Sequence, residues 1–108
     1  MKKIMISQPM AGKTEQEIED TRNKFLAYAA DNGYEVVNTL FTDEWYSPTQ
    51  MKERGVINIP LAFLAKSLEA MTKCDVAYFA KGWENARGCK CEHEAAKAYG
   101  LTVVYEDS

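Results

Sequence analysis

The sequence is poor in the residues that cross-link a chain, bind metals or anchor it in a membrane. It has three cysteines and one histidine among 108 residues. An odd number of cysteines without a regular spacing makes no disulfide framework and is typical of a reducing compartment. No apolar run approaches the ~20 residues of a membrane span, and the start MKKIMIS is too short for a secretory signal. We therefore expect a cytoplasmic protein without a membrane partner.

An excess of positive charge is also missing. Thirteen Lys and Arg residues stand against sixteen Asp and Glu, which gives a net charge of -3. Duplex nucleic acid requires a basic face, so it is not an expected partner. The composition, 46% hydrophobic and 27% charged, is that of a globular protein. A chain of this length buries roughly 60–70% of its surface in one core, and we expect a single domain over residues 1–108.

Short apolar runs alternate with segments of helical period. The expected strands are Lys3–Ser7, Tyr34–Asn38, Asp75–Ala80 and 101–106. The expected helices are 14–32, a short one at 47–55, 58–71, and one from the loop 81–88 to Tyr99. Such alternation predicts parallel pairing with right-handed crossovers. The predicted fold is α/β, a Rossmann-like (flavodoxin-like) three-layer sandwich with a four- to five-stranded parallel sheet.

Three loops should reach the carboxyl edge of this sheet, where such folds bind ligands. They are Gln8–Lys13, Thr39–Asn58 and Lys81–Arg87. The second has no sustained period and is long for a plain connection, which favours a functional loop.

The first loop, SQPMAGKT at 7–14, matches a phosphate loop only in its last three letters. Ser7 replaces the first glycine, and Pro9 removes a backbone donor from the cradle. A helix N-cap at Thr14, with Glu17 completing a capping box, accounts for the end of the motif. Ser7, Gln8 and Gly12 remain candidate ligand contacts.

Glu92 is the carboxylate of interest. It shares a helical stripe with Ala96 and Tyr99, the side that should face the sheet, whereas Glu94 should face solvent. Burial and the positive helix end would act on its pKa in opposite directions. A carboxylate that only complements the helix dipole is the alternative interpretation.

The segments ISQPMAG, LEAMTKCD and GWENARGCKCEHEAAKAYG together resemble the nucleoside 2-deoxyribosyltransferase superfamily, in particular its small bacterial and phage members. The most specific part is Gly88, Glu92 and Ala96. The resemblance implies that Glu92 is a nucleophile that attacks C1′ of the sugar and expels the base. A second base (transferase) or water (hydrolase) then resolves the ester, much as in retaining glycosidases.

The resemblance also implies a small-molecule nucleoside or nucleotide as partner, no cofactor, and a homo-oligomer. The implied substrate-binding residues are Ser7, Gln8, Met10, Gly12, Trp45, Trp83, Asn85, Arg87 and Gly88. Both tryptophans could equally serve packing. Lys81 and Arg87 are either contacts for a 5′-phosphate or solvated loop charges.

Two positions depart from the family pattern. Ser67 and Ala86 stand where active members carry polar helpers, an aspartate at the first and an aspartate or serine at the second. Asn85 or Glu84 are conceivable substitutes. The alternative function is therefore a non-catalytic nucleotide-binding module that has lost these helpers, and a third is a structural or partner-binding protein.

The run CKCEH offers Cys89, Cys91 and His93 as conceivable metal ligands. Alternate residues of a helix point about 200° apart, so they would not converge on one ion. We expect no metal site, free thiols and a surface histidine. Asp75 is interpreted as a structural polar residue at the start of its strand and not as a catalytic one.

Overall fold

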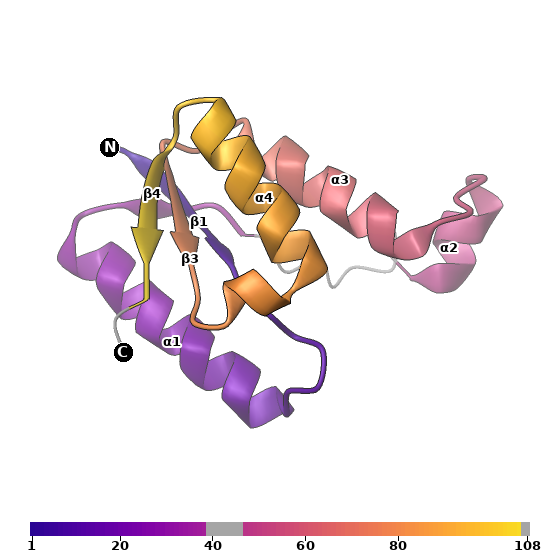
Figure 1. The fold of residues 1–108 in the computed structure, drawn as a ribbon, viewed down its shortest axis with the longest axis horizontal. Coiled ribbons are helices and arrows are strands. Elements are labelled where there is room, and N and C mark those ends of the chain that lie inside the picture. The colour runs from indigo at the N-terminus through magenta and orange to yellow at the C-terminus, as the bar shows by residue number, and fades with distance from the viewer. Residues whose placement is uncertain (39–46, 107–108) are drawn as a thin grey trace.

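The computed structural model describes residues 1–38 and 47–106 and has the predicted α/β architecture (Figure 1). The strands are β1 (Lys3–Ser7), β2 (Glu35–Val36), β3 (Val76–Phe79) and β4 (Thr102–Tyr105). The helices are α1 (Glu15–Asp31), α2 (Pro48–Glu53), α3 (Ile59–Met71) and α4 (Arg87–Ala98), with a 3₁₀ turn, η2 (Trp83–Asn85), before α4. The four strands pair in parallel in the order β2-β1-β3-β4. The fold is Rossmann-like, and the strand order reverses between β1 and β3.

Helices cover both faces of the sheet, which gives three layers (Figure 1). On one face, Phe25 and Ala29 of α1 pack on alternate residues of β1 and β3: Ile4, Ile6, Val76 and Tyr78. On the other, Met71 of α3 and Ala96 of α4 pack on the intervening residues: Met5, Ala77 and Phe79. Both central strands are thus buried from two sides, which explains their continuous apolar runs. None of the described helices is both long and apolar enough to span a membrane.

The local signals of the first helix act as predicted. Thr14 accepts a hydrogen bond from the Glu17 amide, and Glu17 accepts one from the Thr14 amide, so the capping box is present. Gly33 follows the helix with φ +70°, a conformation that favours glycine. Strand β2 is shorter than the predicted 34–38, although the Val37 amide still bonds to the Ile4 carbonyl of β1 at 2.9 Å.

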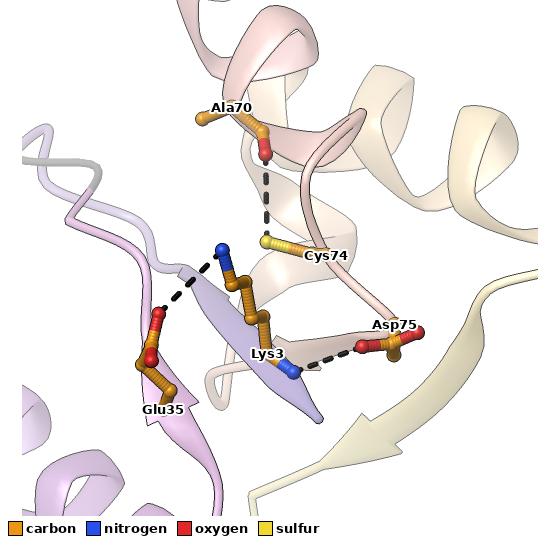
Figure 2. A network of polar contacts seen from close by, with 5 residues as sticks. All are labelled: Lys3, Glu35, Ala70, Cys74 and Asp75. Atoms are coloured by element: carbon orange, nitrogen blue, oxygen red, sulfur yellow. Dashed lines mark hydrogen bonds and ion pairs between the residues drawn. The ribbon is translucent and has the colours of Figure 1, made fainter. Parts of the chain in front are cut away.

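A polar network holds the amino end of the sheet, opposite the ligand edge (Figure 2). The Lys3 amide donates to Asp75 Oδ2 at 2.9 Å, and Lys3 Nζ lies 3.6 Å from Glu35 Oε2. The thiol of Cys74 donates to the Ala70 carbonyl at 3.4 Å, and burial raises its pKa to about 11. Asp75 therefore joins two strands, the structural role predicted for it.

Candidate functional site

The carboxylate of Glu92 lies at the point where the strand order reverses. It belongs to the second turn of α4 and is only 7% exposed, whereas Glu94 is exposed, as predicted. Ser7, the last residue of β1, donates a hydrogen bond from Oγ to Glu92 Oε2 at 3.0 Å. This is the single hydrogen bond of the carboxylate to the described residues. The carboxylate is thus oriented by the sheet and keeps acceptor capacity for a ligand.

Burial raises the pKa of Glu92 from 4.5 to about 7, and the hydrogen bond from Ser7 offsets part of that rise. Of the opposing influences expected from the sequence, burial is the larger. At neutral pH the protonated and ionised forms are therefore both populated. A carboxylate tuned in this way suits nucleophilic or proton-transfer chemistry, because it is less solvated and more basic than a surface glutamate.

Glu92 opens into a groove of about 670 Å³, within the usual range for small-molecule sites. Its walls come from the loop after β1, the first half of α3 and the start of α4. The lining residues are Gln8, Pro9, Met10, Ala11, Pro60, Phe63, Leu64, Ser67, Asn85, Ala86, Arg87, Gly88, Cys89 and Glu92. The α3 wall is mainly apolar, and the remaining walls add the polar residues Gln8, Asn85, Arg87 and Glu92, a combination that suits a ligand with an aromatic part and a hydroxylated part.

A smaller recess of about 70 Å³ adjoins the groove beside Glu92. It is lined by Ile6, Ser7, Gln8, Met10, Ser67 and Glu92. Four of these, Gln8, Met10, Ser67 and Glu92, also line the groove, so the two spaces share a wall. Its lining residues include two with hydroxyls, Ser7 and Ser67, and the carboxylate of Glu92.

Most of the residues predicted to bind substrate lie at these spaces. Six of them line the groove or the recess around Glu92: Ser7, Gln8, Met10, Asn85, Arg87 and Gly88. Of these, Ser7 also bonds to Glu92. Gly12 lines neither space. It adopts φ +77° in a turn in which the Lys13 amide bonds to the Met10 carbonyl at 3.1 Å. The turn requires this backbone conformation, which accounts for a glycine at position 12, and its contact with a ligand stays a prediction.

Trp83 packs instead of lining the groove. Its ring stacks on His93, with centroids 3.9 Å apart, and also lies near Tyr105 and Phe79. It borders a second cavity of about 540 Å³ together with Lys81. The packing alternative for Trp83 is thus the one observed, and Lys81 and Arg87 lie at different cavities. Trp45 falls outside the described residues.

Two expectations for α4 are corrected. His93 is buried, not on the surface, and its Nε2 lies 2.6 Å from the Tyr105 hydroxyl because this side of α4 packs against β4. Tyr99 is 85% exposed because it follows the helix with non-helical angles and leaves the stripe of Ala96. Both errors came from extending one helical stripe without knowing where β4 lies.

Sequence reasoning missed the wall that α3 contributes, Pro60, Phe63 and Leu64. The available signal was that α3 has apolar residues on more than one side. Only Ala70 and Met71 of this helix are buried, so its other apolar residues are left to line a surface. Ser67 and Ala86, singled out as departures from the family pattern, both line the groove.

The thiols do not form a second centre. Cys74 is half-buried, Cys89 buried and Cys91 exposed, and all three are free. Burial raises the pKa of Cys89, and the nearby charge of Glu92 adds to that rise. Within residues 1–38 and 47–106, no three His, Cys, Asp or Glu side chains are placed to hold a metal ion.

The hydrogen bond from Ser7 gives a first prediction. Replacing Ser7 with alanine removes a donor to the ionised carboxylate and should raise the pKa of Glu92 from about 7 to about 8. A carboxyl NMR titration of selectively labelled protein measures this change. Ser7→Thr keeps the hydroxyl and serves as the control, and an unchanged pKa in Ser7→Ala would contradict the assigned bond.

Comparison with known proteins places the chain in a family. A family profile described as "Domain of unknown function (DUF4406)" matches residues 2–105. Searches of curated proteins and of solved structures gave no match. The matched range runs from before β1 to the end of β4 and includes Ser7, Ser67 and Glu92. The chain therefore belongs to the DUF4406 family.

Proposed function

We propose that the groove binds a deoxynucleoside or deoxynucleoside monophosphate and that Glu92 cleaves its N-glycosidic bond. The observation that carries this proposal is the buried carboxylate with a pKa of about 7, fixed by Ser7 at the floor of the groove. The sequence resemblance to nucleoside 2-deoxyribosyltransferases names the same residue. The family description assigns no activity, so the proposal rests on the site and on that resemblance.

The reaction balances with this chain and a nucleoside alone. An oxygen of the Glu92 carboxylate forms a bond to C1′ while the C1′–N bond breaks. The electron pair of the broken C1′–N bond leaves with the base nitrogen, which takes a proton from solvent. The oxygen of water, or the nitrogen of a second base, then bonds to C1′, and the ester C–O bond breaks. The carboxylate is restored, and the attacking group loses a proton to solvent.

The remaining walls suit the two ends of such a substrate. The apolar side chains of Phe63 and Leu64 offer a surface for the flat face of a base. Arg87 is the first residue of α4 and lines the groove, so its charge and the adjacent amides suit a 5′-phosphate.

A specific observation favours a second candidate, a nucleotide-binding module without catalysis. Ser67 and Ala86 line the groove at the two positions where the resemblance leads one to expect polar helpers. Without a proton donor, a leaving base departs slowly. The same groove would then bind its ligand and leave it intact.

Chromatography distinguishes an enzyme that cleaves the N-glycosidic bond from a module that only binds nucleotides. A panel of deoxynucleosides and their monophosphates is incubated with wild type and Glu92→Gln, and free base is measured. Base release that is lost in the variant supports catalysis. Binding by calorimetry without base release supports the module, and neither binding nor release by the folded protein would overturn both.

We also propose a homo-oligomer, covered along α3, in the cytoplasm, where free thiols persist. Leu61 is 57% exposed and the neighbouring Ile57 is 98% exposed, beside the apolar groove wall. Exposed apolar surface of this kind favours burial against a second copy.

Leu61→Glu should therefore shift the protein to monomers in size-exclusion chromatography with light scattering. Tyr99→Glu is the matched control, since Tyr99 is also an exposed apolar residue but lies at the end of a different helix. A wild-type protein that is already monomeric at micromolar concentration would sink this proposal.

A further inference from the structure

We propose that the recess beside Glu92 receives the 2′-hydroxyl of a ribose, so that the site takes ribonucleosides or ribonucleotides at least as well as their 2′-deoxy forms. This inference rests on the proposed function, because it takes Glu92 as the group that meets C1′. It goes further by adding the ribo counterparts to the deoxynucleosides of the proposed function.

The stereochemistry of the attack places the hydroxyl. A carboxylate that displaces the base approaches C1′ from the face opposite the base. In a β-nucleoside that face carries the 2′- and 3′-hydroxyls, and the 2′-carbon is bonded directly to C1′. A 2′-hydroxyl must therefore lie beside the Glu92 carboxylate, and what the protein offers there decides whether it is accepted.

The structure offers a polar space at that place. The recess shares Glu92 with the groove, and its volume of about 70 Å³ exceeds what one water-sized group requires, about 15 Å³. Its walls include the hydroxyls of Ser7 and Ser67. A site that selects a deoxy sugar would fill this space with an apolar side chain, because a desolvated hydroxyl without partners is disfavoured.

Binding, not turnover, is the test, because the ribosyl bond is intrinsically slower to cleave. Dissociation constants are measured by calorimetry on Glu92→Gln for ribo and 2′-deoxy pairs that share a base, both as nucleosides and as 5′-monophosphates. We expect the ribo member of the tightest pair to bind at least as tightly as the deoxy member.

Ser67→Val fills the recess with apolar atoms and should weaken ribo binding about ten-fold more than deoxy binding. Ser67→Ala removes the same hydroxyl without adding bulk and should change the ratio of the two dissociation constants in the same direction. This second variant keeps the test valid if Ser67→Val fails to fold, as judged by thermal melting.

The possible outcomes distinguish a failure of this inference from a failure of the proposed function. A deoxy member that binds more than ten-fold tighter in the starting protein overturns the ribose assignment and leaves the proposed function intact. Equal weakening of both members by Ser67→Val or by Ser67→Ala also overturns it, because the hydroxyl then lies elsewhere. If no pair binds and wild type releases no base, the proposed function itself fails.

Discussion

Replacing Glu92 with glutamine is expected to abolish base release and, at alkaline pH, to stabilise the folded protein. Activity should fall by about 10⁴-fold or more, because a neutral amide oxygen is a poor nucleophile at C1′. Stability should rise because the protein no longer holds a buried charge. The amide oxygen still accepts the hydrogen bond that Ser7 now donates to the carboxylate.

The direction of this stability change with pH follows from the two pKa values of Glu92. Its pKa is about 7 in the folded protein and 4.5 without the fold. The folded state therefore favours the protonated carboxyl, and this stabilisation is fully present below pH 4.5 and is lost as pH rises through 7. The gap corresponds to at most about 3 kcal/mol. Wild type should thus lose stability between pH 5 and 8 by an amount that the Glu92→Gln variant does not lose.

Urea unfolding of both proteins at pH 5 and pH 8 measures this difference. Glu94→Gln is the matched control, because Glu94 is exposed on the same helix two residues away. The control should keep wild-type activity and wild-type pH dependence. A Glu92→Gln variant with the same pH dependence as wild type would show that the carboxylate is not desolvated, and the basis for its reactivity would be lost.

The fold was predictable because each element carries a local signal. The continuous apolar runs of β1 and β3 reflect burial from both sides, and the capping box at Thr14 and the glycine at 33 mark the ends of α1. The order β2-β1-β3-β4 was not predicted, because right-handed crossovers do not by themselves say which face of the sheet each helix covers. Glu92 was also predictable, since helical period alone turned it towards the sheet.

The rest of the site depends on contacts between distant segments. No local pattern shows that Phe63 of α3 faces Arg87 of α4 across the groove, because that depends on how the two helices pack. His93 was misplaced for the same reason, as its partner Tyr105 lies on the last strand. Gly12 illustrates a second difficulty, because a glycine required by a turn and a glycine that contacts a ligand give the same signal in the sequence.

A gain of function at Ser67 is the second large effect we expect. Ser67 lines the groove and the recess together with Glu92, at the position where the resemblance leads one to expect an aspartate. A carboxylate added there would lie close to one that already holds its proton up to about pH 7. Two adjacent carboxylates push their pKa values apart, so the pair keeps one proton near neutrality and ionises the other group.

Ser67→Asp therefore supplies an acid for the leaving base beside an ionised nucleophile. Base release at pH 7 should rise by about 10²-fold, the lower end of what a positioned proton donor contributes, in a chromatographic assay of initial rates. Ser67→Asn is the matched control, because it has the same shape and cannot supply the proton. If the aspartate and asparagine variants gave equal rates, position 67 would not serve the leaving group. Catalysis by this chain, where present, would then depend on a proton donor elsewhere, and the correspondence with the deoxyribosyltransferase pattern would be limited to Glu92 and its helix.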